Sequence, residues 1–224
     1  MKIVFLGNSL TEGSYGGNYV SALREMYPDQ ELINSGKGGN TILNLHDRLD
    51  DDVLTHKPDA VFVMAGGNDA ISYSQPKTRI YYEQVQKVPA GMVTPDQFSQ
   101  IYREILETLR LNFIQTWVSL PPAEYNPAVV EAQQQYNQLA ADAARSIGVK
   151  TLDLMARFKP DDIPDRPALD LAFIQEIGRR SQRGWSDYEA TRQEQDFTYT
   201  FDGLHLLPES AKKMAQLIGE FLPL

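Results

Sequence analysis

Short apolar runs alternate along the chain with segments in which apolar residues recur at helical spacing. The runs predict buried β-strands, and the periodic segments predict amphipathic helices. The predicted strands are residues 3–6, 31–34, 60–64, 116–120 and 149–154. The predicted helices are residues 19–26, 42–54, 95–111, 127–147, 168–180 and 208–222. Residues 70–93 form a long polar segment to which the pattern assigns no element.

Local signals mark several helix ends. In Thr94-Pro95-Asp96-Gln97, a threonine N-cap precedes a proline, and a glutamine follows three residues after the cap, which predicts a helix start. Gly148 predicts the end of the long helix before it. Ser186-Asp187-Tyr188-Glu189 resembles a capping box, so we expect part of the otherwise irregular segment 156–200 to be helical.

Strands that alternate with helices predict an α/β fold, with a mostly parallel sheet covered by helices on both faces. The sequence shows no internal repeat, low-complexity tract or linker, so we expect a single domain over residues 1–224. In such sheets, reactive groups gather beyond the carboxyl ends of the strands. This rule singles out the segments that begin at Gly7, Gly36, Gly66 and Asp153.

Composition narrows the possible partners. The 224-residue chain has 21 lysines and arginines against 30 aspartates and glutamates, a formal net charge of −9. This balance argues against nucleic acid or an anionic membrane surface as a partner. Cysteine is absent, which excludes disulfides, thiolate metal sites and a cysteine nucleophile.

Neither a membrane span nor a metal site is predicted. No apolar run approaches the roughly 20 residues that span a bilayer. The N-terminal run 3–6 is too short for the core of a signal peptide, so we expect a cytoplasmic protein. No group of side chains has the spacing of metal ligands. We interpret His46 and His56 as surface residues.

Two of the singled-out segments carry the residue types of nucleophilic catalysis. Ser9 follows the first strand between two glycines, and a serine becomes a nucleophile when a base takes its proton. Asp202 and His205 lie three residues apart in a turn before the last helix, where a carboxylate can orient an imidazole. Taken singly, each also fits a plain structural turn.

Two further segments supply hydrogen-bond donors. Gly36-Lys37-Gly38-Gly39-Asn40-Thr41 offers bare backbone N–H groups near a helix start, where a phosphate or a developing oxyanion can bind. Asn68, after the third strand, places a side-chain amide at the same edge. Either segment alone is also a normal turn, with Asn68 as its cap.

Together, the four segments resemble the sequence blocks of the SGNH, or GDSL-type, ester hydrolases. Gly7-Asn8-Ser9-Leu10 is similar to the first block, Gly-Asp-Ser-Leu. Residues 34–41 resemble the second, with Gly39 at the position of the oxyanion glycine. Gly66-Gly67-Asn68-Asp69 matches Gly-x-Asn-Asp, and residues 202–205 match Asp-x-x-His. The blocks occur in family order along nearly the whole chain.

The resemblance implies a three-layer α/β/α sandwich, flavodoxin-like, with a five-stranded sheet and no cofactor. It implies a Ser9-His205-Asp202 triad and an oxyanion hole formed by the N–H groups of Ser9 and Gly39 and the amide of Asn68. The expected substrates are small-molecule carboxylic esters with small or medium acyl chains, cleaved through an acyl-enzyme.

The chain departs from the family at two places. Asn8 replaces the family aspartate, which removes one negative charge beside the nucleophile but keeps the shape of the side chain. Residues 156–200 are an insertion that is longer than a compact member of the family needs. Its aromatic residues could line an acyl pocket or only anchor the connection; they are Phe173, Trp185, Tyr188, Phe197 and Tyr199.

Two other functions fit parts of the pattern. A flavodoxin-like module could bind a phosphate or nucleotide in residues 9–13, but it would leave Asp202 and His205 without a role. A non-catalytic relative could bind carbohydrate only, against which the complete triad argues. The natural substrate, the choice between ester and thioester, and the oligomeric state are not set by the sequence.

Overall fold

The computed structural model describes residues 1–160 and 162–224. Within these residues the chain builds a sheet of five parallel strands in the order β2-β1-β3-β4-β5. The strands are β1 (Lys2–Gly7), β2 (Glu31–Gly36), β3 (Ala60–Met64), β4 (Gln115–Leu120) and β5 (Lys150–Asp153). The predicted parallel sheet is confirmed, and its order is the flavodoxin-like one.

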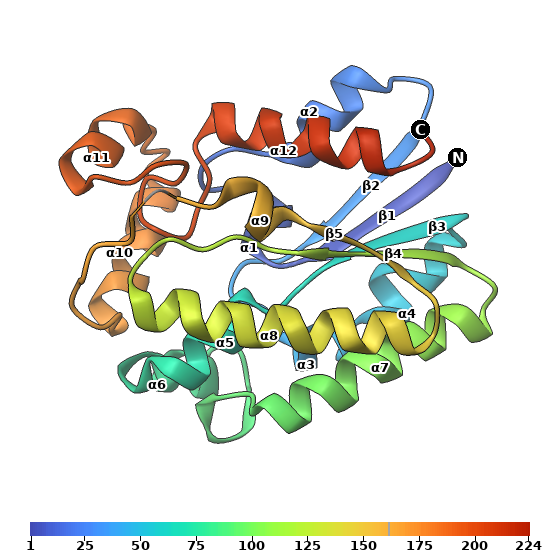
Figure 1. Cartoon of the computed structure of the whole chain (residues 1–224), viewed down its shortest axis with the longest axis horizontal. Coiled ribbons are helices and arrows are strands. Elements are labelled where there is room, and N and C mark those ends of the chain that lie inside the picture. Colours follow the sequence, from blue (N-terminus) through green and yellow to red (C-terminus); the bar gives the residue numbers. More distant parts are fainter. Residues whose placement is uncertain (161) are drawn as a thin grey trace.

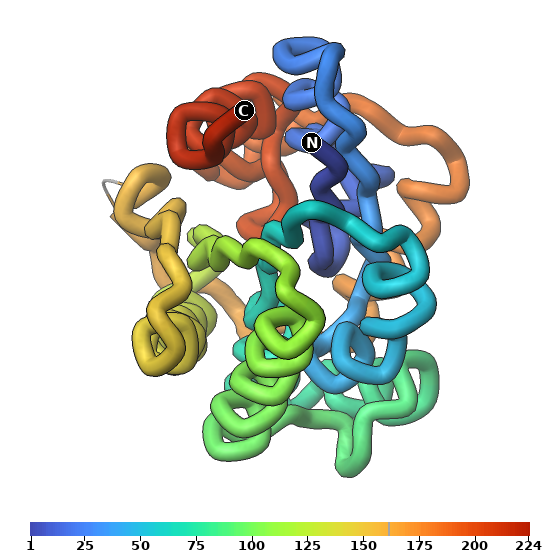
Figure 2. Tube along the Cα trace, turned by 90° about the vertical axis from the view of Figure 1, so that its right-hand side faces the viewer, coloured from blue at the N-terminus to red at the C-terminus, as the bar shows by residue number. Residues whose placement is uncertain are grey.

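Helices cover both faces of the sheet, which gives the three expected layers (Figures 1 and 2). One face carries α2 (Tyr19–Met26) and α12 (Pro208–Phe221), and the other carries α3 (Ile42–Asp47), α7 (Pro95–Leu111) and α8 (Pro127–Ser146). Successive strand residues point to opposite faces. Ile3 and Phe5 of β1 therefore join the core under α12, while Val4 and Leu6 join the core under α7 and α8.

Shorter elements connect these layers. They are α1 (Ser9–Glu12), α4 (Leu49–Asp52), α5 (Gly67–Ser74), α6 (Arg79–Gln84), α9 (Leu154–Phe158), α10 (Leu171–Gln182), α11 (Tyr188–Gln195) and the 3₁₀ helices η1 (Leu54–His56), η2 (Pro76–Thr78) and η3 (Pro89–Gly91). Figure 1 shows α10 and α11 together beyond one end of the sheet. This is the end at which β1 and β3 deliver their carboxyl termini, so segment 156–200 lies beside the predicted site.

Two predictions about elements are wrong. The predicted helix 42–54 breaks at Arg48, whose guanidinium reaches back to the Gly7 carbonyl and the Asn40 amide oxygen. These long-range bonds hold Arg48 outside the regular helix and split the segment into α3, α4 and η1. The polar segment 70–93 contains α5 and α6, because its few apolar residues pack under the site and not in a continuous stripe.

The capping-box and glycine signals in the sequence predicted the ends of α7 and α8 accurately. Helix α7 begins at Pro95 with the Thr94–Gln97 capping box and ends at Leu111. Helix α8 ends one residue before Ile147, and Gly148 adopts the left-handed conformation, with φ of 76°. The predicted capping box at residues 186–189 is wrong, because α11 begins after Asp187 and that side chain makes no capping bond.

None of the helices in residues 1–160 and 162–224 is long and apolar enough to cross a membrane. The same residues contain no group of three or more histidine, aspartate or glutamate side chains placed to hold a metal ion.

Candidate active site

Ser9 lies where β1 turns into α1, at the carboxyl edge of the sheet. Asn8 caps this short helix by accepting a hydrogen bond from the Leu10 N–H at 3.2 Å. The turn is tight, because a side chain at Gly7 would collide with Thr11. Ser9 is thereby partly exposed at the sheet edge, while Gly7 and Asn8 before it stay buried.

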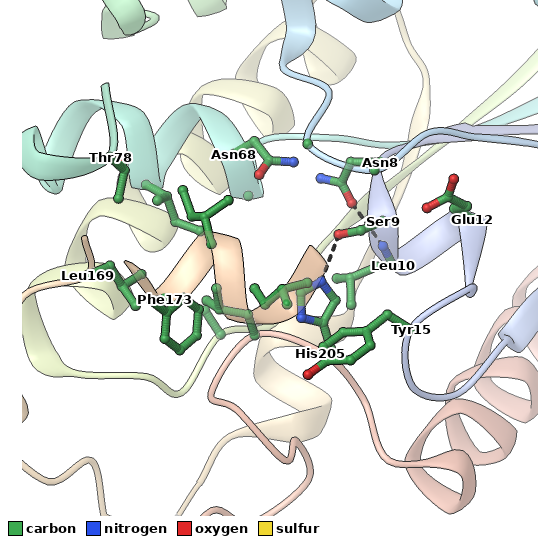
Figure 3. Close-up of a pocket in the computed structure, with 18 of the residues that line it drawn as sticks. Asn8, Ser9, Leu10, Glu12, Tyr15, Asn68, Thr78, Leu169, Phe173 and His205 are labelled. Carbon is green, nitrogen blue, oxygen red and sulfur yellow. Dashed lines mark hydrogen bonds between the residues drawn. The ribbon is translucent and has the colours of Figure 1, made fainter. Parts of the chain in front are cut away.

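His205 and Asp202 meet Ser9 from the other end of the chain. The Ser9 Oγ lies 3.0 Å from His205 Nε2 (Figure 3), and His205 Nδ1 lies 2.8 Å from Asp202 Oδ2. The other carboxylate oxygen of Asp202 accepts the backbone N–H groups of Leu204 and His205. Both side chains are buried, with exposed fractions of 7% for Asp202 and 8% for His205. The arrangement can pass a proton from the serine to the imidazole and stabilise the resulting charge.

The histidine ring is fixed by aromatic packing. Tyr15 contacts it edge-on at 5.2 Å between ring centroids, and Phe201 stacks beside it at 6.2 Å. Burial, and then the nearby Asp202 carboxylate, raise the pKa of the Tyr15 phenol above its ordinary value. Tyr15 therefore stays neutral and acts as a wall of the site, not as an acid.

Glu124, which the sequence patterns did not single out, supports the turn that carries the pair. Its buried carboxylate accepts the N–H groups of Thr198, Tyr199 and Thr200 and the Thr200 hydroxyl. The Thr200 oxygen in turn accepts the Gly203 N–H, and the Glu124 N–H donates to the Gly203 carbonyl. Glu124 thus holds the Asp202–His205 turn from both sides, across 74 residues of sequence.

Three hydrogen-bond donors face the same cavity from three loops. The Ser9 and Gly39 N–H groups donate to no other group of the described residues. The Asn68 amide donates one hydrogen to the Asn40 carbonyl at 3.0 Å, which leaves its second hydrogen free. Gly39 needs its left-handed φ of 75°, and a side chain there would collide with Tyr81 and Gln86. These loops follow β1, β2 and β3, on either side of the switch point of the sheet.

Tyr82 orients the Asn68 amide. Its hydroxyl donates to Asn68 Oδ1 at 2.9 Å, so the amide nitrogen is turned toward the Asn40 carbonyl and the cavity. Tyr82 itself is buried within the polar segment 70–93. No motif marks it, because its role depends on the folding of α6 over α5.

Asp69 joins two of the donor loops. Its Oδ1 accepts the Ile42 N–H at the start of α3, while its Oδ2 and the Tyr102 hydroxyl are buried without a partner among the described residues. Burial raises the pKa of Asp69 from 3.8 to about 7, against hydrogen bonds that lower it. A neutral Asp69 is therefore the favoured form below neutral pH.

This pKa predicts a pH-dependent stability. The folded protein binds the Asp69 proton more tightly than the unfolded chain, so its stability falls as pH rises from about 4 to about 7. The Asp69→Asn side chain does not titrate, so the variant lacks this fall in stability with pH. Relative to wild type, the variant should gain about 2–3 kcal/mol in unfolding free energy between pH 5 and pH 8. Urea titrations at both pH values measure it, with Asp29→Asn on the surface as control. An identical pH dependence in wild type and Asp69→Asn contradicts the prediction.

Asn8 stands where the family has aspartate, and its structure explains why the turn survives. The side chain is 5% exposed and uses its oxygen to cap α1. An aspartate oxygen accepts the same bond. We expect Asn8→Asp to keep kcat/KM within about one order of magnitude, since only one charge changes. An ester assay measures this. A collapse of activity in a folded variant would mean that the site is adapted to a neutral residue.

The site opens into a cavity of about 290 Å³. One side of it is apolar and extends from Ser9 to α10, as Figure 3 shows for Leu169 and Phe173. The apolar lining residues are Ile71, Pro121, Pro122, Ala123, Val129, Leu169, Phe173, Ile174, Ile177 and Leu204. Glu12 lies on the other side of Ser9 (Figure 3), and Ser14 and Tyr81 are further polar residues of the lining.

Of the aromatic residues in segment 156–200, only Phe173 lines this cavity. Trp185 and Tyr188 pack against Tyr15 and Phe201 on the far side of the histidine. Two more serve other contacts: Phe197 lies under the Arg166 guanidinium, and Tyr199 packs on Phe158 in the core. The segment thus contributes both a cavity wall and an anchor, from different residues.

Several charged groups outside the cavity make ion pairs. Asp52 pairs with Arg48 at 2.8 Å and with Lys37 at 2.6 Å. Arg180 pairs with Glu176 and covers the Trp185 ring. His46, predicted to be a surface residue, is partly exposed and lies 3.7 Å from a carboxylate oxygen of Glu104.

Comparisons with known proteins agree with this geometry. The model of the GDSL-like Lipase/Acylhydrolase family matches residues 5–209. An acetylxylan esterase of Geobacillus stearothermophilus is 36% identical over 86 residues, which cover 30% of this chain and 39% of that protein. The match therefore spans well under half of that relative's length.

Solved structures share the fold over nearly the whole chain. A crystal structure of an acetyl xylan esterase has a TM-score of 0.68 at 19% identity, covering 99% of this chain and 100% of the other. A lipase/acylhydrolase from Enterococcus faecalis has a TM-score of 0.62 at 17% identity, covering 98% and 94%. With the family model spanning most of the sequence and all four blocks gathered at one edge of the sheet, the chain belongs to the GDSL-like lipase/acylhydrolase family, a family of ester hydrolases.

Proposed function

We propose that the protein is a serine ester hydrolase that works through an acyl-enzyme. The observation that carries the proposal is the buried Ser9–His205–Asp202 chain of contacts at 3.0 and 2.8 Å, beside three donors with a free hydrogen. A serine within hydrogen-bond distance of an oriented imidazole is the arrangement that activates it as a nucleophile.

The reaction follows from these positions. His205 Nε2 takes the Ser9 proton as Ser9 Oγ bonds to the ester carbonyl carbon. The carbonyl oxygen becomes an oxyanion that the Ser9 and Gly39 N–H groups and the Asn68 amide stabilise. The bond to the alcohol oxygen breaks, and His205 gives that oxygen the proton. Water, deprotonated by His205, then bonds to the acyl carbon; the bond from that carbon to Ser9 Oγ breaks, and His205 returns the proton to Oγ as the acid leaves.

The apolar side of the cavity supports small or medium acyl chains. Each methylene buried there contributes about 0.8 kcal/mol, until the 290 Å³ cavity is filled. The similarity to an acetylxylan esterase favours the short end of this range and a sugar as the alcohol. The wall of Phe173, Ile174 and Ile177 favours chains that extend beyond acetyl.

The two competing functions, binding of a phosphate or nucleotide and binding of carbohydrate without catalysis, do not account for the contact between Ser9 and His205. A phosphate or nucleotide module has no need of a histidine aimed at Ser9, and a carbohydrate-binding relative has no need of an oriented proton acceptor. A fluorophosphonate probe separates them from the hydrolase. The proposal expects covalent labelling of Ser9; an unlabelled, folded protein would contradict it.

The chain-length profile is expected to depend on Phe173 and not on Trp185. In Phe173→Ala, the kcat/KM ratio of hexanoate to acetate p-nitrophenyl ester should fall about fivefold to tenfold, because a contact of about 1 kcal/mol with the longer chain is lost. Trp185→Ala should lower the melting temperature by several degrees and leave the ratio unchanged, since Trp185 touches other aromatic rings.

The measurement is kcat/KM on p-nitrophenyl esters from acetyl to palmitoyl, for wild type, Phe173→Ala and Trp185→Ala. A melting curve is recorded for each of these proteins. If Trp185→Ala changes the ratio and Phe173→Ala does not, the acyl chain lies elsewhere.

A further inference from the structure

One charged residue stands out at the mouth of the site. Among the described residues that line the cavity, Glu12 is the only aspartate, glutamate, lysine or arginine. The remaining lining residues are neutral apart from His205, which belongs to the proton-transfer pair. Whatever charge selectivity the cavity has therefore depends first on Glu12.

The fold places Glu12 on the polar side of Ser9. It is the last residue of α1, three positions after Ser9 on the same short helix. Its carboxylate accepts the Ser14 hydroxyl at 2.9 Å and lies against Gly38. In Figure 3, Glu12 lies on the opposite side of Ser9 from Leu169 and Phe173. An ester bound at Ser9 can thus place its acyl chain on one side and its alcohol toward Glu12.

No cation of the described residues pairs with Glu12. Lys37 and Arg48 both pair with Asp52, at 2.6 and 2.8 Å, and not with Glu12. The Glu12 charge also acts on Tyr81, another residue that lines the cavity. Burial raises the pKa of the Tyr81 phenol, the Gln86 hydrogen bond lowers it, and the Glu12 charge raises it further. Glu12 therefore brings to this side of the cavity a carboxylate that has no ion-pair partner among the described residues.

We propose that Glu12 makes the enzyme select the alcohol half of its ester by charge. The favoured substrates are esters of hydroxyl-rich or cationic alcohols. Esters and thioesters with an anionic leaving group, such as a phosphate-bearing thiol, are disfavoured because the anion would approach an unpaired carboxylate. This inference rests on the proposed esterase function and narrows it to a class of alcohol. Glu12 acts on recognition of the leaving group and takes no part in proton transfer.

Three butyrate esters of similar length test the selectivity for the charge of the alcohol. The neutral alcohol is 2-methoxyethanol, the cationic one is choline, and the anionic one is 2-hydroxyethanesulfonate. We expect kcat/KM to fall by about tenfold or more from the cationic to the anionic ester in wild type. In Glu12→Gln, this ratio should shrink to about twofold or less. Glu83→Gln, an exposed residue of α6 outside the cavity, is the matched control and should keep the wild-type ratio.

A second measurement needs no variant. Raising the salt from about 0.02 M to about 0.5 M should reduce the wild-type ratio, because screening weakens the exposed part of the Glu12 field. Equal turnover of all three esters by wild type, or an unchanged ratio in Glu12→Gln, would overturn the inference and leave the esterase function standing. Failure to hydrolyse even the neutral ester, together with no fluorophosphonate labelling, would overturn the esterase function and the inference with it.

Discussion

Replacing Ser9 by alanine is expected to lower kcat for ester hydrolysis by at least about 10³-fold, while the fold stays intact. The covalent route needs the Oγ that His205 deprotonates at 3.0 Å, and the members of such a triad act as a unit. The remaining donors of Ser9 N–H, Gly39 and Asn68 still bind the carbonyl, so KM should change much less than kcat. Steady-state kinetics on a p-nitrophenyl ester measure both.

The control separates loss of chemistry from loss of structure. Ser146→Ala removes an exposed hydroxyl at the far end of α8 and should behave as wild type. Circular dichroism and the melting temperature of Ser9→Ala should match wild type, since one half-exposed oxygen is removed. Wild-type turnover by folded Ser9→Ala protein would mean that another residue is the nucleophile.

The second large effect is expected at Asn68. Asn68→Ala should lower kcat by about 10²–10³-fold with little change in KM, because an oxyanion donor acts mainly in the transition state. The amide is held for this role by the Tyr82 hydroxyl and the Asn40 carbonyl. Full kcat and KM values on one ester distinguish this from a binding role.

Asn112→Ala, at the exposed end of α7, is the matched asparagine control. A rise in KM at unchanged kcat would identify Asn68 as a residue that binds ground-state substrate. A fall in both kcat and melting temperature would instead mean that the Tyr82–Asn68 contact mainly stabilises α5 against α6.

Local chemistry explains which parts of the fold could be predicted. The ends of α7 depend on Thr94, Pro95 and Gln97, all within four residues, and the prediction there is accurate. The strands β1 and β3 were predicted because residues 3–6 and 60–64 are buried on both faces of the sheet and are hence apolar. The resemblance placed Ser9, Asn68 and His205 at one edge, and the structure brings them around one cavity.

What escaped prediction depends on contacts between distant parts of the chain. Arg48 breaks its helix because its partners, the Gly7 carbonyl and Asn40, come from other loops. Tyr82 and Glu124 support the site from segments that are polar or irregular in sequence. No periodicity reveals that a glutamate will accept backbone N–H groups 74 to 76 residues away.

The Glu124 carboxylate has a consequence for the way this protein loses activity on heating. Ser9 closely follows β1, an inner strand of the sheet, whereas Asp202 and His205 are carried by a turn outside the sheet that Glu124 holds in place. If that turn opens, the buried N–H groups of Tyr199 and Thr200 lose their acceptor at a cost of about 1–3 kcal/mol each, which is less than unfolding the whole sheet requires. Local opening can therefore separate the base from the nucleophile while the layers stay packed. We therefore expect activity to be lost at a lower temperature than the one at which the fold melts, and we expect Glu124, which does not line the cavity, to set the first of these temperatures.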